Sequence, residues 1–531
     1  MAAKFVFVTG GVVSSLGKGI TTASLGRLLK ARGFKVSLQK IDPYYNVDPG
    51  LLSPLQHGEA FITDDGVAAD LDLGHYERFT DVLLTEEASV TTGKIHKLVM
   101  ERELRGEYKG GTVQVVPHVT NEIKQAIWAA AQKSGADIAL VEIGGTVGDM
   151  ESAPFLEAIR QMRWDLDDQN TCFIHVTLLP YISVAGELKT KPTQHSVKNL
   201  RAIGIQPDVI VCRTEKRITR EAKEKIALFC NVRASHVVQN VDVASLYEVP
   251  LMMEEEGLAS IVCQQLGLDH PVSDMSGWKN MLDRYRHPES QAKIALVGKY
   301  VALHDAYLSV AEALTHAGIA LKTAVTIEWL SSESITGENA AKVLAGFDGI
   351  IIPGGYGDRG TEGIIAAVAY AREQRIPFLA IGFGMQLAVV EACRNLLHLF
   401  SANSAEVDPQ TPHPVVYIPE SRLSSNGNRS AARMGASNVL LQEGLIRSLY
   451  GSDSVRERHG NRFEVAPIYV GALEEKGFLC VGRCEKEGYP EAFEVKDHPF
   501  YAAVLYHPEF LSRPDRAHPL FSGFISASLR K

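Results

Sequence analysis

The sequence lacks closely paired cysteines, a membrane-length apolar run at its start and an excess of positive charge. Its seven cysteines are scattered among 531 residues, mostly within apolar runs, which is typical of reduced, buried thiols and not of disulfides or a zinc site. The apolar run at residues 5–8 is too short to span a membrane and lacks the layout of a signal peptide. The net charge of −9 gives no general attraction for nucleic acid. We therefore expect a cytoplasmic protein that binds neither membranes nor nucleic acids.

The chain is too long for a single typical core, so at least two domains are expected. Apolar strands alternate with helical patterns in both halves, as in TNEIKQAIWAAAQ (120–132) followed by ADIALVEIGG (136–145). This alternation predicts two α/β domains, each a doubly wound parallel sheet covered by helices on both faces. The segment 271–291 is polar and poor in apolar periodicity, which indicates a linker. The predicted domains are therefore 1–270 and 292–531.

A glycine-rich loop follows the first strand, in VTGGVVSSLGKGITTASL (8–25). Between Gly11 and Gly17-Lys18 this loop is one residue longer than the strict P-loop, and no hydroxyl residue follows the lysine. The loop is still compatible with a phosphate site, because glycines let backbone N–H groups face phosphate oxygens, the helix N-terminus adds positive potential and Lys18 supplies a charge. A glycine-rich turn without a ligand is the alternative. The order of strand, glycines, lysine and helix favours the phosphate site.

Further charged residues could serve the same nucleotide. Asp72 lies in ADLDLGHYERF (69–79), and Glu142 ends the apolar run ADIALVE. Each alone is more typical of a solvated or capping residue, but beside a P-loop they offer the hard oxygen ligands that Mg²⁺ requires. The loop GELKTKPTQHSVKNL (186–200) contains enough donors to bind a triphosphate, although by itself it is more typical of a solvated loop.

These stretches resemble the synthetase domain of CTP synthases over about residues 1–270. The matching motifs include GGVVSSLGKG, KIDPYYNVDPG, DLDLGHYERF, GGTVQVVPHVTNEI, VEIGGTVGDMES and GELKTKPTQHSVKNL, and the resemblance continues into the second domain through LVGKYVALHDAYLSVAEAL and PGGYGDRG. It implies a P-loop NTPase-like domain in which ATP phosphorylates the C4 oxygen of UTP. Ammonia would then displace the phosphate to give CTP. The resemblance also implies a homotetramer.

The same resemblance implies which residues bind the nucleotides and the metal. Lys18 and Lys40 would neutralise the transferring phosphoryl group, and Asp72 and Glu142 would hold Mg²⁺. The expected ATP-binding residues are Ser15, Gly17, Lys18, Gly19, Ile20 and Asp72. The expected UTP- or CTP-binding residues are Ser14, Gln114, His118, Asp149, Glu151, Lys189, Thr190, Lys191, Pro192, Thr193, Gln194 and Lys225.

The second domain resembles class I glutamine amidotransferases, which have a flavodoxin-like fold. IPFLAIGFGMQLAVV (376–390) reads as a strand, a sharp turn and a helix, the setting of a catalytic nucleophile. The family has a cysteine at the turn, whereas this chain has Gly382. His507 and Glu509 of YHPEF, which would activate that cysteine, are retained. A vestigial glutamine pocket is expected at Gly354, Gly355, Gln386, Glu406 and Arg462.

Other departures accompany Gly382. Phe383 and Leu505 differ from the family pattern, and the lid segment at 424–435 is short, so GTP activation is doubtful as well. Cys393 lies about three helical turns from Gly382, too far to replace the missing thiol. The sequence therefore predicts that glutamine hydrolysis is lost. His507 and Glu509 are then best interpreted as a hydrogen-bonded pair that holds a loop.

Three functions remain open at this point. The favoured one is an ATP-dependent ligase that aminates UTP with free ammonia. The second is a paralogue in a specialised pathway that aminates a UTP-like pyrimidine with a different amine. The third is a non-catalytic regulatory partner of a CTP synthase, against which the occupied chemistry positions of the first domain argue.

Overall fold

The computed structural model describes residues 3–13, 16–269, 271–422 and 432–530. Ser14, Ser15 and most of the segment predicted to be a short lid lie outside the described residues. The chain folds as two units, one made of residues 1–49 and 72–277 and the other of residues 50–71 and 278–531. Residues 50–71, which the sequence placed in the first domain, thus belong to the second unit.

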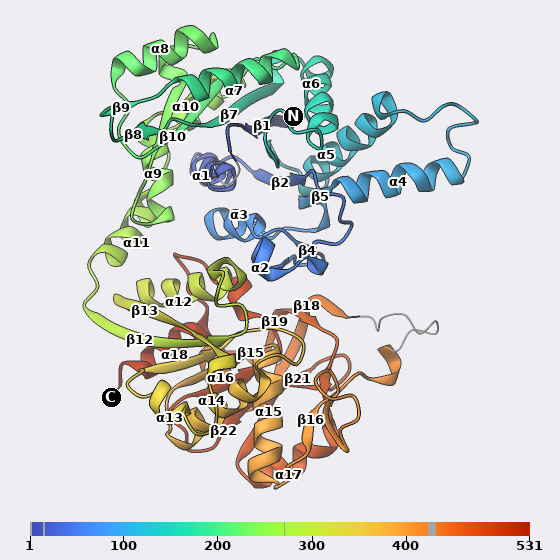
Figure 1. Ribbon diagram of the computed structural model, residues 1–531, viewed down its shortest axis with the longest axis vertical. Coiled ribbons are helices and arrows are strands. Elements are labelled where there is room, and N and C mark those ends of the chain that lie inside the picture. Colours follow the sequence, from blue (N-terminus) through green and yellow to red (C-terminus); the bar gives the residue numbers. More distant parts are fainter. Residues whose placement is uncertain (1–2, 14–15, 270, 423–431, 531) are drawn as a thin grey trace. The chain divides into compact units, whose positions relative to one another are not determined.

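The first unit is built on a seven-stranded parallel sheet (Figure 1). In spatial order its strands are β11 (Val237–Val241), β10 (Val209–Thr214), β7 (Thr171–Leu178), β1 (Lys4–Gly10), β6 (Ile138–Ile143), β2 (Val36–Asp42) and β5 (Ser89–Thr91). Every residue of β2 and β6 is buried, as expected for strands covered on both faces. From β1 the chain runs to β2 and β5 on one side, returns to β6 next to β1, and then continues to β7, β10 and β11 on the other side. The loops that follow the neighbouring strands β1 and β6 therefore lead away in opposite directions, which makes a topological switch point, where α/β proteins bind ligands.

Helices cover both faces of this sheet. Phe5 and Phe7 of β1 point into the same core as α5 (Thr120–Ser134) and α6 (Ala153–Leu166). Leu38 and Leu140 point to the opposite face and lie against Gly26 of α1 (Lys18–Ala31). The remaining helices that bear on the site are α3 (Asp72–Thr80), α4 (Thr92–Leu104), α7 (Lys191–Ala202) and α8 (Arg220–Cys230).

The second unit contains a nine-stranded mixed sheet (Figure 1). Five parallel strands come first in spatial order: β13 (Thr323–Ser331), β12 (Ser290–Gly298), β14 (Gly349–Ile352), β15 (Phe378–Ile381) and β23 (Tyr501–Val504). Four antiparallel strands continue the sheet: β22 (Pro490–Val495), β21 (Phe478–Cys484), β18 (Arg433–Leu441) and β19 (Ser454–Asn461). The prediction of two parallel-sheet α/β domains is confirmed, and the antiparallel extension was not foreseen.

The two faces of this sheet are buried in separate cores. Successive residues of β15 alternate between them, Phe378 and Ala380 on one side and Leu379 and Ile381 on the other. The principal helices of the unit are α12 (Leu308–Ala320), α14 (Thr361–Glu373), α15 (Phe383–Leu396) and α18 (Pro519–Ser528). This two-sided burial explains why the parallel strands read as continuous apolar runs in the sequence.

Residues 50–71 are anchored to the second unit by polar contacts and by one aromatic residue. Asp64 forms a bidentate ion pair with Arg456 (2.6 and 2.7 Å), and Arg458 donates to the carbonyl oxygen of Ile62 (2.9 Å). Phe61 is buried edge-on against Phe510, with ring centroids 5.0 Å apart. Residues 50–71 therefore form part of the packed core of this unit.

All seven cysteines are buried and unpaired, as the sequence predicted. Within the described residues, no helix combines the length and the apolar character needed to cross a membrane.

Candidate functional site

The glycine-rich loop of the first unit leads from β1 directly into α1. Gly17, in the left-handed region (φ 83°), precedes the first helical residue, Lys18. A Cβ on Gly19 would lie 2.1 Å from Oδ1 of Asp72. The position that carries a hydroxyl residue in the strict P-loop is thus filled by a carboxylate from α3, which explains why the sequence has glycine there. Ile20, the last of the expected ATP-binding residues, is half-buried in the same turn.

Lys40 is the centre of a buried cluster of charges at the carboxyl edge of the sheet. It lies opposite Glu142 in the register between β2 and β6, with 3.1 Å between Nζ and Oε1. Lys40 also forms an ion pair with Asp72, and Oδ1 of Asp42 lies 4.0 Å from its ammonium. Tyr76 donates a hydrogen bond to the other oxygen of Glu142. Two carboxylates from different elements are therefore held together by one ammonium group.

Lys18 belongs to the same cluster. It is 8% exposed, and its Nζ donates to the carbonyl oxygen of Gly145 (2.8 Å). Burial lowers the pKa of Lys18, against the opposing charge of Glu142. Burial also raises the pKa of Glu142, only partly offset by Lys40. The pKa of Asp72 is lowered because Lys40, together with weaker contributions, outweighs the effect of burial.

The cluster joins two ammonium groups and two carboxylates at the mouth of a phosphate-type loop. Carboxylate oxygens are the ligands that Mg²⁺ prefers, so Asp72 and Glu142 fit the metal that the sequence implied. The ammonium groups of Lys18 and Lys40 have the positive charge that would suit a transferring phosphoryl group. Neither Tyr76 nor Asp42 was foreseen, and no short sequence pattern would have identified them.

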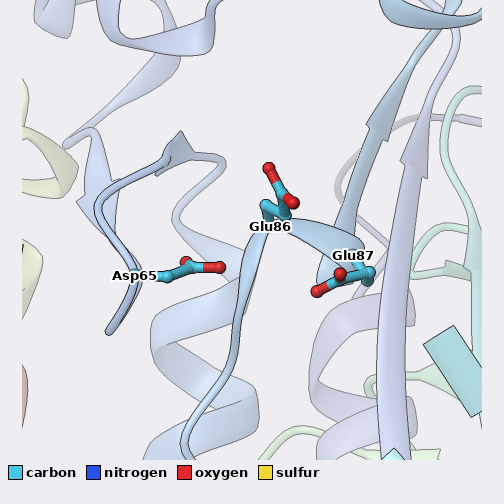
Figure 2. A group of neighbouring side chains, drawn as sticks. All are labelled: Asp65, Glu86 and Glu87. Atoms are coloured by element: carbon cyan, nitrogen blue, oxygen red, sulfur yellow. The ribbon is translucent and has the colours of Figure 1, made fainter. Parts of the chain in front are cut away.

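Another group of acidic residues is drawn in Figure 2. Glu86 and Glu87 lie on the 3₁₀ turn η2 (Glu86–Ala88) of the first unit, whereas Asp65 belongs to the second unit. Glu87 accepts a hydrogen bond from Thr85 (2.6 Å) and pairs with Lys133. Burial acts to raise its pKa, but these two partners lower it below the usual value. Local partners therefore account for Glu87, and we assign no metal to this group.

Apart from Ser14, which lies outside the described residues, and Lys225 of α8, the residues expected to bind UTP or CTP fall into three places in the first unit. Gln114 directly precedes η3 (Val115–Val119) and His118 lies within it, and the Gln114 N–H donates to Nδ1 of His118 (3.0 Å). Asp149 accepts from the Thr146 N–H (3.0 Å), and Glu151 is exposed nearby in the chain. The third place is the start of α7 and the loop before it, with Lys189, Thr190, Lys191, Pro192, Thr193 and Gln194.

Helix α7 lies directly beside the glycine-rich loop. A Cβ on Gly11 would be 1.8 Å from Oγ of Ser196, so any larger residue there would displace the Ser196 hydroxyl. His175 hydrogen-bonds both Ser196 (2.8 Å) and Thr9 of β1 (2.9 Å), and burial lowers its pKa to about 3, so this imidazole is neutral. Lys225 of α8 is exposed, and its charge reaches Glu187, the partner of Lys189. The hydrogen bond between His175 and Ser196, which fixes α7 beside β7, was not predicted from the sequence.

In the second unit, the loops after β14, β15 and β23 meet at one edge of the sheet because these parallel strands are neighbours. Gly382 connects β15 to α15 with φ 55° and ψ −114°, and its N–H donates to the carbonyl oxygen of Val504 (2.8 Å). His507 follows β23, and its Nδ1 lies 2.7 Å from Oε1 of Glu509. A Cβ on Gly382 would lie 3.1 Å from Cε1 and 3.2 Å from Nε2 of His507. The backbone of a nucleophile elbow is thus present beside a histidine–glutamate pair, without a nucleophile.

The expected glutamine pocket surrounds this elbow. Gly354 lies against the His507 ring, and the N–H of Gly357 donates to Glu406 (2.7 Å). Gln386 donates to the carbonyl oxygen of Phe463 (3.2 Å), while Arg462 is exposed. Burial raises the pKa of Glu406 above its ordinary value.

A role for Lys299 was not predicted from the sequence. Its Nζ donates to the carbonyl oxygens of Tyr356 (3.0 Å) and Gly357 (2.5 Å) and lies 4.2 Å from the centroid of the Phe383 ring. A Cβ on Gly355 would lie 3.7 Å from the Phe383 ring and 3.8 Å from Cδ of Lys299. Burial lowers the pKa of Lys299 to about 8. Phe383 is therefore held by a cation–π contact against the loop that contains Gly354 and Gly355.

Cys393 cannot supply the missing nucleophile. It lies inside α15, fully buried, and burial raises its pKa to about 12. Because the thiolate is the reactive form, this side chain is inert at neutral pH, in agreement with the expectation from its distance along the helix.

Comparison with known proteins gives matches over both units. Residues 4–268 match the family described as CTP synthase N-terminus, and residues 302–527 match the class-I glutamine amidotransferase family. The CTP synthase of Halalkalibacterium halodurans is 54% identical over 532 residues, 100% of each chain. That of Geobacillus kaustophilus is 53% identical over 99% of this chain and all of its own. Among solved structures, the Trypanosoma brucei CTPS glutaminase domain with bound acivicin is 35% identical, with a TM-score of 0.43, over 45% of this chain and 94% of that one.

Proposed function

The chain belongs to the CTP synthase family of ATP-dependent ligases, and we propose that it converts UTP into CTP with free ammonia and not with nitrogen from glutamine. One observation carries this proposal. Gly382 stands at the elbow beside His507 and Glu509, whereas the charged cluster of the first unit is complete.

In the first unit, the reaction needs positioning and charge neutralisation more than covalent help from the protein. Lys18 and Lys40 would bind the γ-phosphoryl group of ATP as it moves to the C4 oxygen of UTP. Mg²⁺ held by Asp72 and Glu142 would neutralise phosphate charge when it is bound. Lys189, Lys191 and Gln194 at the start of α7 are the proposed contacts to the UTP phosphates.

In the second unit, glutamine hydrolysis requires a nucleophile that this elbow does not carry. Removing the nucleophile from a coupled catalytic group typically lowers the rate by several orders of magnitude. Among the described residues, the three atoms nearest to a Cβ added at Gly382 are Cε1 and Nε2 of His507 and Cα of Gly354. None of these three atoms belongs to a thiol or a hydroxyl group. The retained parts are therefore insufficient for the acyl-enzyme route.

We expect CTP to form from UTP, ATP and Mg²⁺ when ammonium chloride is added at alkaline pH, where free ammonia is abundant. With glutamine at neutral pH we expect a rate lower by about 10³-fold or more, because the nucleophile is absent. Nucleotide analysis by liquid chromatography measures CTP, and a coupled assay measures glutamate. Release of glutamate at a rate equal to CTP formation would contradict the proposal.

A different amine donor is the second candidate, because Gly382 removes side-chain bulk from the pocket as well as reactivity. If ammonium supports no CTP formation but another amine triggers ATP consumption with UTP, this second candidate is correct. A purely regulatory role would require that no amine triggers ATP turnover, and the complete cluster around Lys40 argues against it. Homotetramer formation, implied by the resemblance, is testable by light scattering with and without nucleotides.

A further inference from the structure

His507 has one ring nitrogen that is free to meet a solute. Nδ1 is bonded to Glu509, whereas Nε2 has no hydrogen-bond partner among the residues that the structure describes. Two glycines border this nitrogen: added Cβ atoms would lie 3.2 Å away on Gly382 and 3.8 Å away on Gly460. The His507 side chain is 15% exposed, so part of it is in contact with solvent.

Gly460 leaves this space open on its side. A Cβ on Gly460 would lie 2.4 Å from Cδ1 of Ile62, so a side chain there would require Ile62 to move. On the Gly382 side, the space is that of the cysteine side chain which the family has at this position. The space beside Nε2 therefore suits a molecule of one heavy atom, such as water or ammonium, better than a larger amine.

The charged groups that act on the His507 ring are two carboxylates, whereas the buried guanidinium of Arg458 is directed to the carbonyl oxygen of Ile62 (2.9 Å). Glu509 contacts the ring directly, and the carboxylate of Glu59 is near enough for its charge to act on His507. Glu59 is fixed in place because Ser309, at the start of α12, donates its N–H to it (2.8 Å) and its hydroxyl as well. The other neighbours are the Phe510 ring, stacked at 5.4 Å, and the backbone carbonyl of Arg458. Two carboxylates and one imidazole favour a small cation over an anion.

We propose that ammonium binds beside Nε2 of His507 and that His507 removes one proton from it, which makes His507 a catalytic residue of the ammonia-dependent reaction. This inference rests on the proposed use of free ammonia. The Nε2 lone pair takes a proton from NH₄⁺, and the electron pair of the broken N–H bond stays on nitrogen as NH₃. The resulting imidazolium, stabilised by Glu509, then releases its proton to water.

Removal of a proton from ammonium is needed near neutral pH. Most ammonia is then protonated and has no lone pair with which to attack carbon. A side chain that performs proton transfer should have a pKa near the working pH. Burial acts to lower the pKa of His507, but Glu509 and Glu59 raise it above its ordinary value, so this imidazole is a stronger base than an exposed one.

His507→Gln, assayed in the full-length enzyme, tests the role directly. At neutral pH we expect ammonium-supported CTP formation to fall by about 100-fold, within the usual range for general-base catalysis, and to recover as pH rises and free ammonia becomes abundant. Hydroxylamine is already uncharged at neutral pH, so its use by the variant should be unchanged. His413→Gln, on β17 (His413–Tyr417) of the same unit, is the matched control and should behave as the parent.

A pH series at constant free-ammonia concentration separates capture of ammonium from direct entry of ammonia. In the parent enzyme we expect the rate to rise as pH falls, because ammonium increases tenfold per pH unit, and to level off at the pKa of His507. In His507→Gln the rate should be flat. Glu509→Gln should move the levelling-off to lower pH, since the pKa of His507 is no longer raised, and it provides the test if His507→Gln does not fold.

These experiments distinguish failure of the inference about His507 from failure of the proposed function. If the parent makes CTP from ammonium and His507→Gln does so equally well at neutral pH, the inference is wrong and the proposed function stands. Equal losses with ammonium and hydroxylamine would also overturn it, since they indicate a merely structural role. If the parent makes no CTP from ammonium at any pH, the proposed function fails and the inference fails with it.

Discussion

Lys18→Ala will reduce ammonium-supported CTP formation by about 10³-fold or more, the effect expected when a cation that neutralises a transferring phosphoryl group is removed. Lys18 is the first residue of α1, 8% exposed, and its ammonium lies in the cluster formed with Lys40, Asp72 and Glu142. The neighbouring cation Lys40 cannot take over, because it is already engaged with both carboxylates.

The measurement is the rate of CTP formation at saturating UTP, ATP and ammonium. Lys30→Ala is the matched control, because Lys30 is an exposed lysine at the other end of the same helix, where its ammonium donates to the carbonyl oxygen of Thr80. It should leave the rate within about twofold of the parent, since surface substitutions rarely change stability by more than about 0.5 kcal/mol. If Lys18→Ala retains most of the activity, the phosphate site has been assigned to the wrong residue.

Gly382→Cys will create glutamine hydrolysis at a rate at least about 100-fold above that of the parent. The introduced thiol would sit beside His507, whose Nδ1 is already bonded to Glu509, and such a pairing is what activates a cysteine nucleophile. The gain will fall short of full glutaminase activity, because the Cβ would lie 3.1 Å from Cε1 of His507 and the ring must shift by a few tenths of an ångström.

This substitution also has a structural consequence. The backbone of residue 382 lies at φ 55° and ψ −114°, a conformation that costs about 1–3 kcal/mol for residues other than glycine. Gly382→Ala has the same strain without the thiol, so both variants should lose a similar free energy of unfolding, measured by denaturant titration. Only Gly382→Cys should release glutamate. If neither variant does so, the short lid and Phe383, and not the missing sulfur alone, prevent glutamine chemistry.

Much of the candidate site could be predicted because it is encoded within short stretches of chain. The glycine loop before α1 requires only a strand, several glycines and a lysine in order. That residue 382 is a glycine is likewise read directly from the sequence. The apolar strands predicted two α/β units with helices on both faces, and the sheets confirm this class.

Other features depend on residues that meet only in the folded chain. The sequence could not indicate why Gly19 replaces the usual hydroxyl residue, because the reason is Asp72 on another helix. Tyr76 beside Glu142 and Lys299 beside Phe383 were missed for the same cause. The residues of each pair are far apart in the sequence, and they form no sequence motif. They become neighbours only when the strands and helices pack together.

By itself, the sequence indicated the family and predicted a phosphate loop and the loss of a thiol at residue 382, since each prediction rests on neighbouring residues or on motifs long enough to be specific. Only the tertiary structure decided that residues 50–71 pack onto the second unit, with Glu59 beside His507 and Ile62 against Gly460. The physical reason is that burial of Phe61 and the ion pair of Asp64 with Arg456 join positions far apart in the chain, and contacts of this kind leave no periodic signal in a single sequence.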